Sequence, residues 1–160
     1  MTTETAAQGG AELFKDFAAG SGSFFRPVDG DMFIGAFTGV SDAGESSYEG
    51  KTPTKGIWWH FDLYKFSDPT ARVRYLAEEG PDKGKQLDAV LDGRTTSETG
   101  PRSKARAWFA ALLKREMSND EDKAKVFAEA VGKRAVLVCG KNEDGTRIVL
   151  KTILPYKEMS

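Results

Sequence analysis

Hydrophobic and polar side chains alternate most regularly between residues 55 and 66. The odd positions of this segment are apolar: Ile57, Trp59, Phe61 and Leu63. The even positions carry rings and polar groups: Trp58, His60, Asp62 and Tyr64. Because successive side chains of a strand point to opposite faces, the pattern predicts an antiparallel strand with one face in the core and one in solvent.

Shorter segments of the same kind predict further strands, and two segments have helical spacing. We expect strands at residues 31–40, 71–77, 134–139 and 146–154. Residues 86–97 predict either another strand pair or a strand broken at Gly93. We expect one helix at about 101–116, where Pro101 suits a first helical position, and a second from about Asn119 to Val131. The apolar stripe of the first helix predicts packing on the core: Ala105, Trp108, Phe109, Leu112 and Leu113. The polar segment 41–55 predicts a long loop.

This order of elements predicts a mainly β protein with helices. Three strands with a hairpin elaboration, then helices, then two strands is the order of an OB-fold-like five-stranded β-barrel, with its helix between strands three and four. An SH3-like barrel, or a small α+β sheet with helices on one face, has a compatible order. We place this domain at residues 24–157. Residues 1–23 are expected to form a flexible leader, with a possible short helix at 11–19.

Composition excludes several classes of chemistry. The chain has 160 residues, enough for one domain, with one cysteine and one histidine. A single Cys139 cannot form an internal disulfide, and Cys139 with His60 cannot supply a structural zinc site. No Walker A sequence, glycine-rich dinucleotide motif or nucleophile elbow is present. We therefore expect a cytoplasmic binding protein without catalytic residues, metal or cofactor, and without a membrane-spanning segment.

The net charge of −1 hides an uneven distribution. Residues 1–50 carry two basic and eight acidic side chains, whereas residues 51–115 carry thirteen basic and eight acidic. Residues 116–160 carry eight of each. An anionic partner is therefore expected to bind the middle third of the chain.

Four motifs carry a resemblance to a known group of proteins. They are GIWWHFDLY at 56–64, TSETGPRSKARAWFAALL at 96–113, GKRAVLV at 132–138 and TRIVLKTILP at 146–155. In this order they resemble small proteins encoded by bacteriophages and related mobile elements, over roughly residues 30–155. Members of that group resemble OB-fold single-stranded DNA-binding or replication-accessory proteins. The resemblance implies the same fold and a role in DNA replication or recombination, in the host cytoplasm if the chain is phage-encoded. The end of the chain differs from bacterial single-strand-binding proteins, because residues 156–160 do not form an acidic tail with a terminal aromatic residue.

Two sets of residues are candidates for binding single-stranded nucleic acid, which is held by stacking of bases on rings and by cations along the backbone. The first set is the mixed face of the aromatic strand, Trp58, His60 and Tyr64, flanked by Lys51, Lys55 and Lys65. The second set is basic: Arg94, Arg102, Lys104 and Arg106 bracket a predicted helix N-terminus, where phosphate is stabilised, and Arg72 and Arg74 alternate on a predicted strand. The alternatives are rings packed beneath a loop and cations on a solvated face.

The function that these residues favour is binding of single-stranded DNA with low sequence specificity. Expected partners are single-stranded DNA, replication or recombination proteins, and a second copy of the chain. A protein-interaction or assembly module built on a small β-barrel is the alternative, with the acidic N-terminal third and Phe24-Phe25 as docking elements. An enzyme that uses scattered carboxylates and a divalent metal ranks last.

Overall fold

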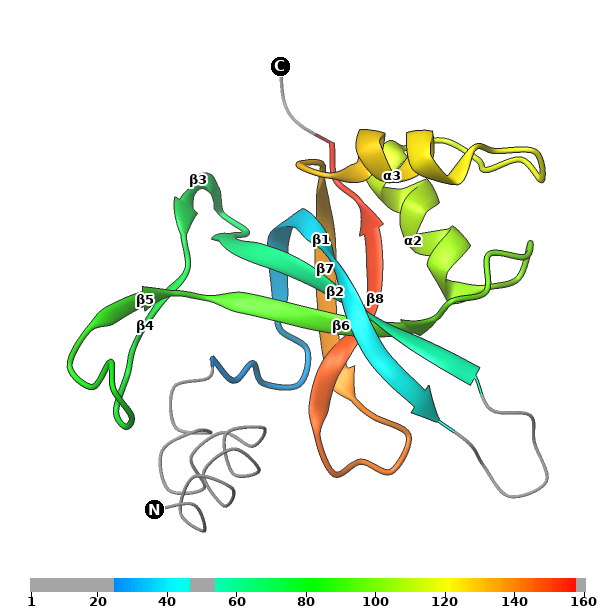
Figure 1. Ribbon diagram of the computed structural model, residues 1–160. Coiled ribbons are helices and arrows are strands. Elements are labelled where there is room, and N and C mark those ends of the chain that lie inside the picture. The colour runs from blue at the N-terminus through cyan, green and yellow to red at the C-terminus, as the bar shows by residue number, and fades with distance from the viewer. Residues whose placement is uncertain (1–24, 47–53, 158–160) are drawn as a thin grey trace, which may run out of the picture.

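The computed structural model describes residues 25–46 and 54–157 (Figure 1). It is mainly β, with 47% of the described residues in strands and 15% in helices, and the sheet is antiparallel. The expected leader at 1–23, its helix at 11–19, and Lys51 lie outside the described residues.

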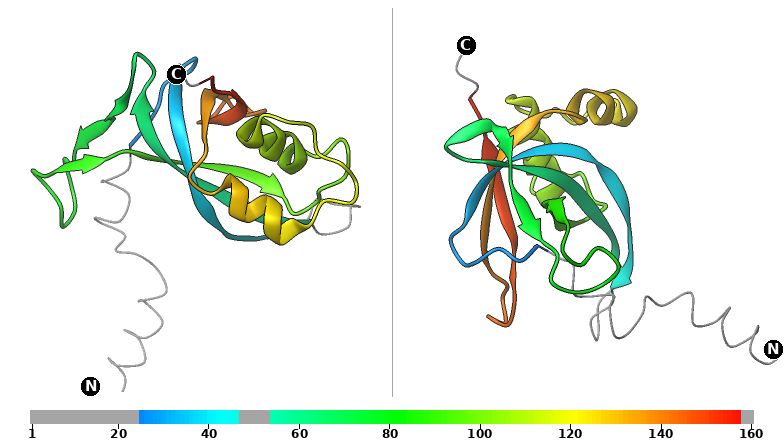
Figure 2. Two further views of the ribbon diagram at one scale, coloured as in Figure 1. Left: turned by 90° about the horizontal axis from the view of Figure 1, so that it is seen from above. Right: turned by 90° about the vertical axis from the view of Figure 1, so that its left-hand side faces the viewer.

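Five long strands form the main sheet: β1 (Met32–Ser46), β2 (Thr54–Lys65), β6 (Val90–Thr96), β7 (Arg134–Lys141) and β8 (Ile148–Pro155). Their order across the sheet is β6-β2-β1-β7-β8, and the short β3 (Asp68–Arg72) pairs with the end of β2 beyond β6. A separate hairpin of β4 (Arg74–Leu76) and β5 (Gln86–Asp88) extends away from the helices (Figures 1 and 2).

Two helices connect β6 to β7. The first, α2 (Lys104–Leu113), is capped by Ser103, whose side chain accepts a hydrogen bond from the backbone N–H of Arg106. The second, α3 (Lys123–Ala130), is capped in the same way by Asp122. Both begin later than expected, because Pro101 and Asn119 lie in the preceding turns.

The core lies between the sheet and α2. We call the face of β2 that carries its odd positions the inner face, and Trp59, Phe61 and Leu63 on it are at most 2% exposed. Trp108 of α2 packs edge-on against Trp59, with 5.2 Å between ring centroids. This confirms the assignment of the odd positions of β2 to the core, and that of Trp108 and Leu112 from the helical stripe.

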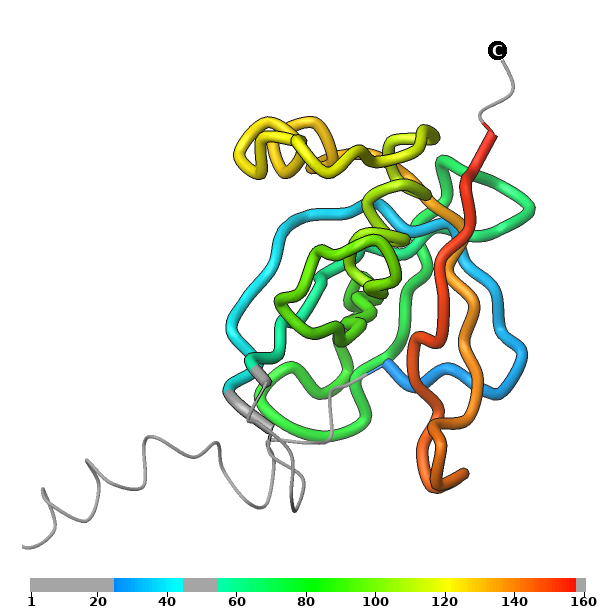
Figure 3. The backbone as a smooth tube through the Cα atoms, turned by 90° about the vertical axis from the view of Figure 1, so that its right-hand side faces the viewer, coloured from blue at the N-terminus to red at the C-terminus, as the bar shows by residue number. Residues whose placement is uncertain are grey.

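The sheet curls so that its two terminal strands approach one another. The strands β6 and β8 contact each other, but within the described residues no hydrogen-bonded ladder joins them. Trp108 and Leu150 of β8 meet at Gly93 of β6 instead, and a Cβ at Gly93 would lie 2.5 Å from the Trp108 ring. In Figure 3 the α2 segment lies between the β1 segment and the β7–β8 segment, consistent with a helix that covers the end of the curled sheet.

Three sequence-based expectations differ from the structure. The polar segment 41–55 is not all loop, because β1 continues to Ser46 through irregularities in its register at Phe37/Gly39 and Asp42/Gly44. The strand at 86–97 is divided before Val90 and is continuous through Gly93. Phe25 is partly buried and not exposed, because its ring packs against Phe33 at 5.6 Å and against Tyr75 at 6.2 Å, and Phe24 lies outside the described residues.

Neither helix in the described part of the chain combines the length and the apolar character needed to cross a lipid bilayer.

Candidate functional site

The outer face of β2, opposite the core, carries the predicted aromatic residues. Trp58 is 37% exposed, and the Arg94 guanidinium of β6 lies 6.0 Å from the centroid of its ring. Trp58 and Arg94 are direct cross-strand partners. Gly56 makes room for the Arg94 side chain, because a Cβ there would lie 2.7 Å from Nη2 of Arg94. Arg94 forms no salt bridge with the described residues, so the pair presents a ring and an unpaired cation to solvent.

His60 lies two residues further along the same face and is held at both ring nitrogens. Its Nε2 is 2.8 Å from Oγ of Ser41 on β1, and its Nδ1 is 2.6 Å from Oδ1 of Asp92 on β6. Ser41, His60 and Asp92 are thus linked in the same order as the Ser-His-Asp triad of a serine hydrolase. The three side chains nevertheless stand partly or fully exposed on a sheet surface, and Asp92 is a direct cross-strand partner of His60. With both nitrogens engaged, His60 can offer a ligand its ring face.

Tyr64 lies near the end of β2, and two guanidinium groups contact its ring. Arg134 lies 4.5 Å and Arg72 lies 5.4 Å from the ring centroid. These contacts are cation–π interactions, and they cover part of the ring that a base would need. Tyr64 is therefore a less open stacking surface than Trp58.

Carboxylates neutralise the two arginines that follow β2. Arg72 pairs with Asp62 at 3.5 Å and with Asp88 at 3.2 Å, and Arg74 pairs with Asp88 at 3.0 Å. Exposed pairs such as these are worth little to stability, but they lower the net positive charge that a phosphate would meet.

The basic residues near α2 lie apart from this face, because α2 packs against β6, β7 and β8 on the inner side of the sheet. Arg106 is a structural residue, since its guanidinium donates to Oδ1 of Asn119 at 2.8 Å and to the carbonyl of Met117. The ammonium of Lys104 lies 5.0 Å from the Trp108 ring, and desolvation together with nearby Lys151 lowers its pKa. Arg102 is exposed in the loop before α2.

Lys55 lies at the start of β2 and occupies one of its odd-numbered positions. Strand alternation therefore puts its side chain on the side opposite Trp58. Its ammonium is 3.8 Å from Asp42. The structure thus brings together Trp58, His60, Tyr64, Arg72 and Arg94 on one face of the sheet. It separates them from Lys55, Arg102, Lys104 and Arg106.

Three residues of the outer face were missed by the sequence reasoning: Ser41, Asp92 and Arg134. Alternation on the strand at 86–97 could have found Asp92, because it shares a face with Arg94. Ser41 carried no such signal, since its segment was expected to be a loop.

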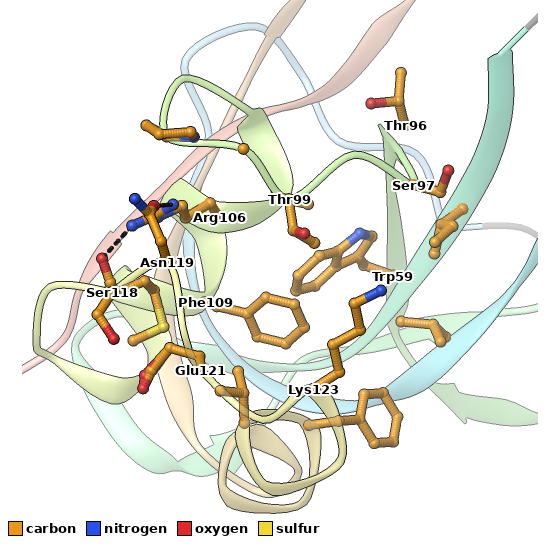
Figure 4. A pocket seen from close by; sticks show the side chains of 18 residues that line it. Trp59, Thr96, Ser97, Thr99, Arg106, Phe109, Ser118, Asn119, Glu121 and Lys123 are labelled. Carbon is orange, nitrogen blue, oxygen red and sulfur yellow. Dashed lines mark hydrogen bonds between the residues drawn. The ribbon is translucent and has the colours of Figure 1, made fainter.

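A cavity of about 510 Å³ lies on the other side of the sheet, between β1, β2, the loop after β6 and the two helices (Figure 4). Its wall includes three aromatic rings, those of Trp59 on β2, Phe109 on α2 and Phe127 on α3. None of the predicted binding residues except Arg106 lines it.

The described residues offer neither a metal-binding cluster nor an accessible thiol. Within residues 25–46 and 54–157, no three His, Cys, Asp or Glu side chains are placed to hold a metal ion together. Cys139 is buried and free, and burial, with a smaller contribution from Asp31, raises the pKa of its thiol to about 11.

Comparisons of this chain with models of protein families, with curated proteins and with solved structures found no match.

Proposed function

We propose that the protein is an OB-type barrel that binds single-stranded DNA with low sequence specificity on the outer face of β1, β2 and β6. The strand order β6-β2-β1-β7-β8 supports the fold, because a meander of three strands, helices and a terminal hairpin occur in the OB order. Contact between β6 and β8 supports closure through side chains. The outer face of strands two and three, here β2 and β6, is where OB folds bind oligonucleotides.

One observation carries the proposal: the exposed ring of Trp58 beside the unpaired guanidinium of Arg94. Stacking of one base on an aromatic ring contributes about 1–3 kcal/mol and depends little on the identity of the base. The guanidinium can contact a neighbouring phosphate while it still lies against the ring. His60, held by Ser41 and Asp92, adds a second ring in a fixed orientation.

The electrostatic contribution to this binding is expected to be modest. Arg72 and Arg74 are paired with carboxylates, so Arg94 and Arg134, which form no salt bridge with the described residues, remain on this face for phosphate contacts. For single strands the logarithm of the affinity falls by about 0.7 per phosphate for each decade of salt. Two contacts therefore predict a loss of about 7-fold between about 50 and 200 mM salt.

Fluorescence anisotropy with labelled oligonucleotides of about 16 nucleotides tests the proposal, with the single strand and its duplex compared at both salt concentrations. We expect the single strand to bind more tightly than the duplex and to show this shallow salt dependence. Absence of single-strand binding at micromolar protein in low salt would overturn the proposal. The cellular role proposed with it is replication or recombination of phage or mobile-element DNA in the cytoplasm.

A further inference from the structure

The cavity between the sheet and the helices has the size of a small-molecule site. Its volume of about 510 Å³ falls within the range of about 300–1,000 Å³ that is usual for ligand pockets. It lies on the inner side of the sheet, where the Trp59 ring forms part of the wall (Figure 4). Trp58 is on the outer side by strand alternation.

The wall of the cavity offers mainly apolar surface. The indole N–H of Trp59 donates to Oγ1 of Thr95 at 2.8 Å, so the Trp59 ring has no donor left for a ligand. The Phe109 ring lies 4.7 Å from that of Trp59, yet both Phe109 and Phe127 are only partly buried. Two phenyl rings left partly uncovered beside a hollow favour a ligand with an apolar body.

Three charged side chains line the cavity, and two of them are engaged elsewhere. Arg106 donates to Asn119 and to the Met117 carbonyl. Glu121 accepts two hydrogen bonds from Arg115, at 2.9 and 3.0 Å.

The third charged residue, Lys123, differs from these two. It is exposed and forms no ion pair with the described residues. In Figure 4 its side chain extends across the cavity toward Trp59. Of the three charged side chains that line the cavity, Lys123 is therefore the one without a partner among the described residues, and its charge is positive.

From the apolar wall and the unpaired ammonium we propose that this cavity binds a small amphipathic anion. Such a ligand has an apolar chain or ring against Trp59, Phe109 and Phe127. Its single carboxylate or sulfonate pairs with Lys123. Thr99, in the loop after β6, lines the cavity as well and offers a polar group close to these rings (Figure 4). This site is independent of DNA binding on the outer face.

The test measures binding of two probes, dodecanoate by isothermal titration calorimetry and anilinonaphthalene sulfonate by fluorescence. The decisive variant is Lys123→Glu. The matched control is Lys125→Glu, which makes the same charge change on the same helix at an exposed position outside the cavity lining. Circular dichroism and thermal melts of both variants establish that they fold.

We expect both probes to bind the natural chain with a stoichiometry of one. Because hydrogen bonds to charged groups are the strong ones, Lys123→Glu should weaken both probes by about tenfold or more, with Lys125→Glu changing them less than about twofold. Absence of saturable binding, or equal effects of the two variants, would overturn the proposal. Addition of single-stranded DNA should leave probe binding unchanged; displacement of the probe by DNA would overturn the independence of the two sites.

Discussion

Replacement of Gly93 by alanine tests the proposed closure of the curled sheet through side chains. Gly93 lies on β6 opposite Trp59, and its side-chain position points at the contact between α2 and β8. A Cβ there would lie 2.5 and 2.8 Å from two atoms of the Trp108 ring and 2.6 Å from Cδ2 of Leu150. Trp108 and Leu150 are each 2% exposed, so neither side chain has free space into which it can move.

The expected cost follows from two opposing effects. Overpacking of a dense core costs about 1–3 kcal/mol. A Gly-to-Ala change also raises the free energy of unfolding by about 0.4–1 kcal/mol, because alanine restricts the unfolded chain. All three distances lie under 3.0 Å, so the overpacking cost belongs in the upper part of its range, about 2–3 kcal/mol. The net loss of unfolding free energy is therefore about 1–2.6 kcal/mol, which for a chain of this size lowers Tm by about 2–10 °C.

Urea denaturation and thermal melts of Gly93→Ala measure this loss, and Gly140→Ala is the matched control. Gly140 also lies in a strand, on β7, but its Cβ would meet chiefly Cγ of the exposed, flexible Lys151 side chain at 3.0 Å. The control should change stability by less than about 0.5 kcal/mol. If Gly93→Ala were as stable as the natural chain, Trp108 would not be packed against β6, and closure through side chains would be refuted.

Two further predictions concern buried or engaged groups. Arg106→Ala removes the hydrogen bonds to Asn119 and to the Met117 carbonyl, so it should cost about 1–3 kcal/mol and raise amide hydrogen exchange between α2 and α3. Unchanged exchange there would contradict the role given to Arg106. Because burial raises the pKa of the Cys139 thiol to about 11, the thiol stays protonated well above neutral pH. Ellman's reagent at about pH 8 should label Cys139 in urea but not in the folded protein, and rapid labelling of folded protein would contradict its burial.

The alternation in β2 could be read from sequence because it depends on neighbouring residues alone. It placed Trp59 and Phe61 in the core and Trp58 outside, as found. The continuation of β1 to Ser46 could not be read in this way. Register irregularities interrupt its period of two, and its partner is contributed by another segment of the chain.

Gly93 shows why tertiary contacts override a local rule. A glycine inside a strand usually weakens it, so a break at Gly93 was one of the two alternatives that the sequence indicated for residues 86–97. Its small size is instead required by Trp108 and Leu150, which come from later in the chain.

The candidate site was also predictable only where it depends on neighbouring residues in the sequence. The outward positions of β2 were predictable, but the carboxylates that pair with Arg72 and His60 depend on cross-strand register. The cavity depends on how α2 and α3 dock on the sheet, which no short pattern in the sequence specifies.

The affinity of Trp58 variants for single-stranded DNA tests the central claim most directly. Trp58→Ala removes the exposed ring, whereas Trp58→Phe keeps an aromatic face at the same position on β2. Loss of one stacked base at about 1–3 kcal/mol predicts that Trp58→Ala weakens binding by about 5- to 150-fold. Trp58→Phe should retain most of the affinity. Equal affinities of the natural chain and Trp58→Ala, with both proteins folded, would contradict binding on the outer face.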